Sequence, residues 1–409
     1  MKYFWIGCLL LFSCNTQKGL FGKRTAHEKY ADRLKESGLH ETEMGTKWLN
    51  AAQKALTAPV NITIPFRETG YFPADQPMSA GYVFEATRGR TIEISLEVTP
   101  NGAAIFIDLY SLLGNEPKHE RSSDSAGIIK FEIEETGRYL IRLQPQLLES
   151  RGYTLSITTA PSLAYPLPKG TGRIQSYWGA QRDGGARSHE GIDIFAARNT
   201  AALAAADGRI TRVGENNLGG NVIFMRPEKR NISLYYAHLE KQLVSSGQTV
   251  KAGDTIGLIG NTGNARSTPP HLHFGIYASG GAIDPLPFVD PGKRSPPAIT
   301  ANTKMLGDTL RLNRSFQGIE NQTPVRVLAA QADNYKIVLP GGEHAVVPRE
   351  ALSATGTTIR INEVKQMLSN PAQPAAFIQQ VEPGTYPLVG KYNNFALVKA
   401  GNYTGWISL

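Results

Sequence analysis

Three segments decide the organisation of this chain: His189-Glu190-Gly191-Ile192-Asp193, Tyr235-Tyr236-Ala237-His238-Leu239 and His271-Leu272-His273-Phe274. Together they hold four of its eight histidines. The short apolar runs around them are punctuated by glycine, which predicts strands and turns. Working outward, we expect one β-rich domain over residues 170–290.

The third segment is expected to place two imidazoles in one site. His271 and His273 are two residues apart in an apolar run, and residues at that spacing face the same side of a strand. Such a pair needs partners for its ring nitrogens. His189 in a loop and Asp193 on the following strand can converge on one point, although such pairs often only form a hydrogen bond. His238, expected to end a strand, matters only if it faces the same cleft.

Two imidazoles and one carboxylate from these segments would give zinc three protein ligands and leave a fourth position open, as catalysis requires. Zinc at such a site activates water and polarises a carbonyl oxygen. One histidine of the His271/His273 pair can bind metal while its neighbour transfers protons or stabilises an oxyanion. A serine nucleophile is disfavoured, because Ser188 lies in no nucleophile-elbow pattern.

These motifs resemble the lysostaphin/LytM-type zinc endopeptidases, which cut peptidoglycan cross-links. The resemblance covers residues 170–290 and includes Val250-Lys251-Ala252-Gly253-Asp254 and Gly260-Asn261-Thr262-Gly263-Asn264. It implies that one zinc ion is bound by His189, Asp193 and His273. It further implies that His238 and His271 are catalytic, as base or transition-state stabiliser, and leaves their order open. The family's His-x-His-Phe commonly continues with glutamate, where this chain has Gly275.

The whole chain is too long for one core, and its composition predicts a mainly β protein. We expect a short helical hairpin, a β-sandwich, an antiparallel-sheet metallopeptidase domain and two small β-barrels. The predicted ranges are a signal peptide at 1–13, a tether and helical hairpin at 14–60, the sandwich at 61–160, the metallopeptidase domain at 170–290, a linker at 291–303, and Src-homology-type barrels at 304–353 and 354–409.

Local patterns support this order. Thr25 and Glu28 predict a helical capping box, and the nearby His27 and His40 are expected to face solvent. Strict apolar alternation between residues 61 and 160 predicts an antiparallel sandwich, with hairpin turns at Gly89-Arg90 and Gly137-Arg138. Residues 333–341 and 392–401 repeat one pattern and resemble bacterial barrels that bind cell-wall peptides. Packing alone is the alternative role for these barrels.

The first fifteen residues contain both cysteines, Cys8 and Cys14. An apolar run from Phe4 to Phe12 fits a signal-peptide core and is too short to span a bilayer. Leu11-Phe12-Ser13-Cys14 resembles a bacterial lipobox, which implies cleavage before Cys14 and a lipid anchor on it. A plain secretory signal is the alternative. The expected location is the bacterial envelope, lipid-anchored and facing the periplasm, at the outer membrane.

The net charge of +8 suits an anionic surface such as the cell wall, and ordinary solubility explains it equally well. No basic run is interleaved with aromatic residues, which disfavours nucleic acid. The expected reaction is hydrolysis of amide bonds in peptidoglycan stem peptides or cross-links. The alternatives are a non-catalytic wall-binding scaffold that activates an amidase, and a metallopeptidase acting on proteins or a secreted peptide. The sequence leaves the oligomeric state open.

Overall fold

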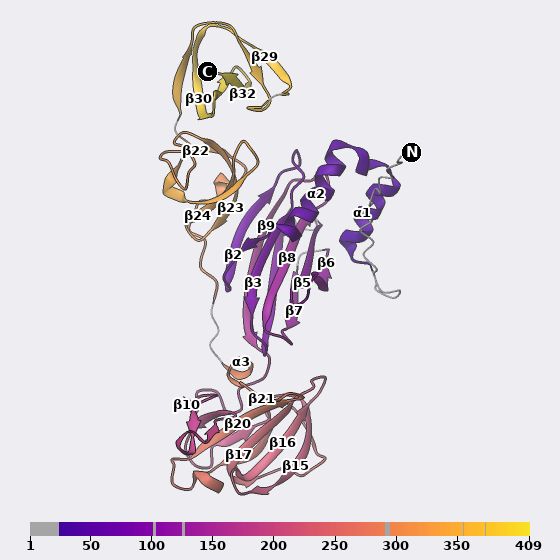
Figure 1. Ribbon diagram of the computed structural model, residues 1–409, viewed down its shortest axis with the longest axis vertical. Helices are drawn as coiled ribbons and strands as arrows, with labels where there is room; N and C mark the ends of the chain where they lie inside the picture. Colours follow the sequence, from indigo (N-terminus) through magenta and orange to yellow (C-terminus); the bar gives the residue numbers. More distant parts are fainter. Residues whose placement is uncertain (1–23, 101–103, 125–126, 291–294, 355, 373) are drawn as a thin grey trace, which may run out of the picture.

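The computed structural model describes residues 24–100, 104–124, 127–290, 295–354, 356–372 and 374–409. The predicted mainly β fold is confirmed. A helical hairpin lies on a sandwich in the middle, the histidine-bearing sheet lies at one end, and two small barrels lie toward the other (Figure 1). The predicted signal peptide and Cys14 fall outside the described residues. Among the described helices, none is long and apolar enough to cross a membrane.

The helical hairpin consists of α1 (Ala26–Glu36) and α2 (Glu43–Thr57), and the capping box of Thr25 and Glu28 is present. The expectation that His27 faces solvent is wrong. Its ring is 5% exposed, stacks on Trp48 with centroids 4.8 Å apart, and has Nε2 2.7 Å from Oε1 of Gln144. His27 lies seven residues before the buried Leu34 and therefore shares its helical face. His40 is partly buried.

The sandwich has two sheets. The first has the order β1-β3-β8-β5-β6, and the second contains β2-β9-β4-β7. Their bounds are β1 (Val60–Asn61), β2 (Phe66–Phe72), β3 (Ala80–Ala86), β4 (Arg90–Thr99), β5 (Ile105–Ser111), β6 (Lys118–Ser123), β7 (Gly127–Glu132), β8 (Gly137–Pro145) and β9 (Arg151–Pro161). The alternating residues of β4 point inward, where Ile92 and Ile94 are fully buried.

The two hairpin turns predicted in the sandwich are wrong. Gly89-Arg90 joins β3 to β4, and Gly137-Arg138 begins β8 after β7, but each pair of strands is divided between the two sheets. The chain therefore crosses the core at both places. In the second sheet β4 and β9 alternate between buried and less buried residues, whereas β3, β5 and β8 of the first sheet are buried at nearly every position. Alternation shows which face of a strand is buried, but it does not reveal which strands pair.

The C-terminal strands form two small, curved units. The first comprises β22 (Thr309–Leu312), β23 (Pro324–Gln331), β24 (Asn334–Val338), β25 (His344–Pro348) and β26 (Leu352–Ser353). The second comprises β27 (Thr357–Ile361), β28 (Lys365–Leu368), β29 (Phe377–Val381), β30 (Gly384–Tyr392), β31 (Phe395–Ala400) and β32 (Tyr403–Ser408). The repeated sequence pattern corresponds to the paired strands β24–β25 and β31–β32.

The first of these units is joined to the sandwich through one continuous sheet. Strand β23 pairs with β2, with Thr69 opposite Ala330. Beside this joint Glu68 is fully buried. Its Oε1 accepts hydrogen bonds from the hydroxyls of Tyr82 and Tyr153, and its Oε2 accepts one from Nε2 of Gln331. The buried carboxylate therefore ties both sandwich sheets to the C-terminal unit.

The histidine-bearing sheet, called the central sheet below, has the order β10-β13-β20-β17-β16-β15-β18, with β14, β19 and β21 at its margins. Residues 221–226 and 232–238 pair as the hairpin β16–β17. Bounds are β10 (Arg173–Ser176), β13 (Ile192–Phe195), β14 (Ala201–Leu203), β15 (Gly208–Asn216), β16 (Gly220–Pro227), β17 (Ser233–Gln242), β18 (Thr249–Val250), β19 (Thr255–Ile259), β20 (His271–Ala278) and β21 (Gly281–Ile283), with a separate hairpin β11 (Gln181–Arg182) and β12 (Arg187–Ser188).

The central sheet is attached to the end of the sandwich. After β21 the helix α3 (Leu286–Val289) lies beside the turn at Gly89. The ring of Phe288 occupies the space that a Cβ at Gly89 would need. Arg90 pairs with Asp290 at 2.9 Å, and Arg230 pairs with Glu132 at 2.8 Å. These contacts hold the central sheet at the far end of the sandwich from the barrels (Figure 1).

We predict that Glu68→Ala lowers the free energy of unfolding by about 3 kcal/mol, because it leaves buried hydroxyl and amide donors without an acceptor. Chemical denaturation followed by circular dichroism measures this. The exposed Glu85 on β3 is the matched control, and Glu85→Ala is expected to change stability by less than about 0.5 kcal/mol. Equal stability of the two variants would show that the joint does not depend on Glu68.

Candidate metal centre and cleft

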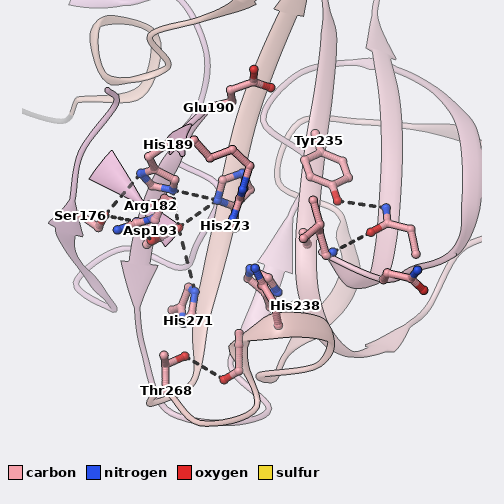
Figure 2. Close-up of a pocket in the computed structure, with 18 of the residues that line it drawn as sticks. Ser176, Arg182, His189, Glu190, Asp193, Tyr235, His238, Thr268, His271 and His273 are labelled. Carbon is pink, nitrogen blue, oxygen red and sulfur yellow. Dashed lines mark hydrogen bonds and ion pairs between the residues drawn. The ribbon is translucent and has the colours of Figure 1, made fainter. Parts of the chain in front are cut away.

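Strand register brings the predicted site residues together. On β13 and β20, Asp193 is opposite His273 and Phe195 is opposite His271. On β17 and β20, Ala237 is opposite His273, which places the next residue, His238, beside the pair. His189 lies in the loop before β13. Figure 2 shows all five predicted side chains around one cleft.

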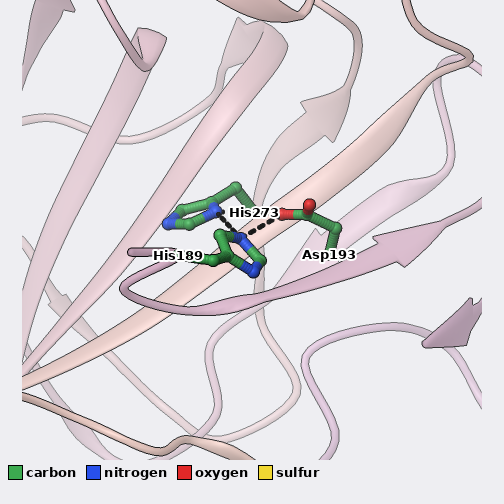
Figure 3. Close-up of side chains that lie close together, drawn as sticks. All are labelled: His189, Asp193 and His273. Carbon is green, nitrogen blue, oxygen red and sulfur yellow. Dashed lines mark hydrogen bonds and ion pairs between the residues drawn. The ribbon is translucent and has the colours of Figure 1, made fainter. Parts of the chain in front are cut away.

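Three donor atoms form a tight triangle at one side of this cleft (Figure 3). Nε2 of His189 is 2.9 Å from Oδ1 of Asp193 and 3.0 Å from Nδ1 of His273. The third side, from Nδ1 of His273 to Oδ1 of Asp193, is 2.9 Å. All three ligand atoms lie within 4.8 Å of one another. His189 and Asp193 are 4% and 6% exposed, so water does not shield these atoms from one another.

The hydrogen bonds around the triangle leave lone pairs facing inward. Nδ1 of His189 lies 2.9 Å from the carbonyl oxygen of Tyr177, and donation there leaves Nε2 unprotonated. Nη2 of Arg182 donates to Oδ2 of Asp193 at 2.8 Å, which keeps Oδ1 directed at the histidines. A carboxylate oxygen and imidazole nitrogens at this spacing are the donors that zinc prefers. The residues present therefore fit a zinc ion.

The charge state of the triangle agrees with a cation site. Burial opposes ionisation of Asp193, but its close contacts with the rings of His189 and His273 outweigh burial and hold its pKa well below the usual range. Burial also lowers the pKa of His273, which favours the neutral ring that can bind metal.

The other two histidines present their Nε2 atoms beside the triangle. Nδ1 of His271 lies 2.9 Å from the carbonyl oxygen of Pro269, and Nδ1 of His238 lies 2.9 Å from that of Thr262. Donation from both Nδ1 atoms leaves both Nε2 atoms able to accept a proton. The rings are 4.9 Å apart. Burial, reinforced by His271, lowers the pKa of His238 to about 4, so its ring is neutral near pH 7.

His238 has an unusual backbone. The expectation that it ends a strand is wrong, because β17 continues to Gln242. The φ angle of His238 is +61°, and β17 changes partner there, from β20 before it to β19 after it. Its N–H donates to the carbonyl oxygen of Gly219 at 2.7 Å. Non-glycine residues in this region are strained and concentrate at functional sites.

The cleft has a volume of about 990 Å³, and its lining residues all lie between 176 and 277. Among the described residues, the helical hairpin, the sandwich and the barrels contribute nothing to its walls. Sequence reasoning missed Arg182, which reaches Asp193 only because the β11–β12 hairpin folds over the site. It also missed Tyr277, and Tyr235 as part of the wall. No motif marks Arg182 or Tyr277.

We predict that His238→Asn is more stable than His271→Asn by about 1 kcal/mol, because asparagine tolerates a positive φ better than histidine does. His271 is the matched control. It is equally buried, also bonds a carbonyl through Nδ1, and has no positive φ. Thermal unfolding in the presence of a chelator measures the difference. A His238→Asn protein that is no more stable than the control would contradict backbone strain at this position.

The model of peptidase family M23 matches residues 187–285, a range that contains all five side chains. The L-Ala–D-Glu endopeptidase of Bacillus subtilis is 37% identical over 139 residues, 31% of this chain and 42% of that protein. The murein hydrolase activator NlpD of Salmonella typhimurium is 35% identical over 133 residues, 32% of this chain and 33% of that protein. The chain thus spans less than half the length of these relatives.

Among solved structures, the catalytic domain of the antimicrobial peptidase lysostaphin from Staphylococcus simulans is 34% identical. The similarity covers 29% of this chain and 91% of that one, with a TM-score of 0.27. The resemblance to lysostaphin/LytM-type peptidases that the histidine motifs carry is confirmed over this part of the chain. Residues 187–285 belong to peptidase family M23.

Proposed function

We propose that the protein is a zinc-dependent endopeptidase that hydrolyses amide bonds in peptidoglycan stem peptides or cross-links at the bacterial cell envelope. The observation that carries this proposal is the site itself. A complete triangle of two imidazoles and a carboxylate lies beside two further histidines whose Nε2 atoms can accept a proton, in one cleft of a peptidase-family domain. The named activity of the Bacillus relative supports the substrate class.

In this proposal His189, Asp193 and His273 hold one zinc ion. Bound there, zinc supplies Lewis acidity that polarises a carbonyl and lowers the pKa of water to about 7. His271 lies nearer the triangle, with Nε2 4.0 Å from Oδ1 of Asp193. Nε2 of one of the two histidines, His271 or His238, then accepts a proton from the attacking water and returns it to the leaving amine as the amide bond breaks. Nε2 of the other stabilises the oxyanion once it is protonated. Which of the two is the base and which steadies the oxyanion is open in this mechanism.

The similarity to the activator NlpD favours a second candidate, a non-catalytic scaffold that activates a peptidoglycan amidase. An activator has no chemical need for five converging site residues. This chain keeps all five within one cleft, which favours catalysis.

In this proposal the rest of the chain places the metallopeptidase domain at the membrane and against the cell wall. A signal peptide at 1–13 and a lipid on Cys14 anchor the protein to a membrane facing the periplasm, and the outer membrane is the proposed site. The helical hairpin and the sandwich space the central sheet from that anchor. The barrels at 304–353 and 354–409 bind the wall.

We predict that the purified protein with zinc releases peptide fragments from purified sacculi, read by mass spectrometry, and holds one zinc per chain. His189→Ala is expected to lose both zinc and activity, because it removes a ligand. His271→Ala is expected to keep zinc and lose activity by a factor on the order of 10²–10⁴, because it removes a proton-transfer group.

The possible outcomes separate the candidates. A wild-type protein that holds no zinc and leaves sacculi intact, yet stimulates an amidase, would establish the scaffold. Cleavage of protein substrates but not of sacculi would establish a different peptidase. Full activity of His271→Ala would remove that residue from the mechanism.

The anchor has its own test. Cys14→Ser is expected to move the protein from the membrane fraction to the soluble envelope fraction, because the thiol that carries the lipid is gone. Gln53→Ser, a change at an exposed position of α2, is the control and is expected to stay with the membrane. Unchanged membrane association of Cys14→Ser would support a plain secretory signal.

A further inference from the structure

The carbonyl that orients His238 belongs to Thr262, whose side-chain hydroxyl forms two further hydrogen bonds. Thr262 follows β19, in the segment Gly260-Asn261-Thr262-Gly263. Its Oγ1 donates to the carbonyl oxygen of Leu239 at 2.9 Å and accepts the N–H of Asn221 at 3.0 Å. One hydroxyl therefore joins β16 and β17 at the residue directly after His238.

The backbone around Thr262 is built for close approach. Gly220 and Gly263 have φ angles of +62° and +71°, and the Cβ of any residue at Gly220 would lie 2.2 Å from Oγ1 of Thr262. Gly263 faces the same contact, because a Cβ there would lie 2.3 Å from N of Gly220. Side chains at either position would push the two loops apart and move the Thr262 carbonyl.

The backbone of His238 is held by hydrogen bonds to Gly219 and Gly260, but these do not set the direction of its ring. The ring packs against those of His271 and His273, and among the described residues its one hydrogen bond runs from Nδ1 to the Thr262 carbonyl. The same bond selects the tautomer, because a proton on Nδ1 leaves the lone pair on Nε2. Movement of the carbonyl would allow the ring to turn and the proton to change nitrogen.

We propose that Thr262 is a positioning residue for proton transfer, which fixes the direction and the tautomer of His238 through its own carbonyl. This inference rests on the proposed function for its kinetic readout. The tautomer itself can be read without any substrate.

The kinetic test compares Thr262→Val with Thr262→Ser on a soluble peptidoglycan fragment. Valine keeps the shape but removes both Oγ1 bonds, so kcat is expected to fall about tenfold, while KM and the zinc content stay at wild-type values. Serine keeps the hydroxyl and is expected to restore kcat. The control is Thr171→Val, which removes a 2.7 Å bond from Oγ1 to the Pro168 carbonyl outside the cleft and should keep the wild-type kcat.

The second measurement is ¹⁵N NMR of the histidine rings in the zinc-loaded wild-type protein. His238 is expected as the Nδ1–H tautomer, and in Thr262→Val as a mixture of both. A wild-type His238 protonated on Nε2 overturns the inference even if Thr262→Val does not fold. Wild-type kcat in Thr262→Val, or no rescue by serine, overturns it while the proposed function stands. A wild-type protein without activity overturns the proposed function, and the NMR result then decides the inference alone.

Discussion

Three lone-pair donors within about 3 Å of one another are the constraint on which the rest of this structure depends. Nε2 of His189, Oδ1 of Asp193 and Nδ1 of His273 face one another in a buried place. Such atoms repel unless a cation lies between them. The pairing of β13 with β20 and the bond from Arg182 hold them in this arrangement. The scaffold therefore builds a site shaped for a metal ion.

The register of β13 against β20 also gives different surroundings to two histidines that are only two residues apart. His273 is opposite Asp193 and joins the triangle, whereas His271 is opposite Phe195 and stacks on its ring with centroids 4.8 Å apart. One strand thus supplies both a ligand and a proton-transfer group in our proposal. His238 completes the arrangement from the neighbouring strand, at the point where β17 changes partner.

Much of this could be predicted from sequence, because it depends on short-range periodicity. Alternation predicted the strands of the sandwich, and the spacing of His271 and His273 placed both rings on one face of β20. The Thr25–Glu28 capping box was also predictable, since it is local. The predicted domain ranges stay predictions.

The parts that could not be predicted depend on contacts between distant segments. The fusion of β2 with β23, and the burial of Glu68 beside it, join residues more than 250 positions apart. The burial of His27 could not be predicted because two of its partners, Gln144 and Phe106, come from the sandwich. The positive φ of His238 has no sequence signal, since glycine or asparagine normally marks such a position.

The most direct test of the central claim is anomalous diffraction at the zinc edge from crystals of the zinc-loaded protein. The account predicts one strong peak, bound by Nε2 of His189, Oδ1 of Asp193 and Nδ1 of His273, with His238 and His271 nearby but not ligating. A peak bound by His238 or His271 instead, or no peak at the triangle in fully folded protein, would contradict it.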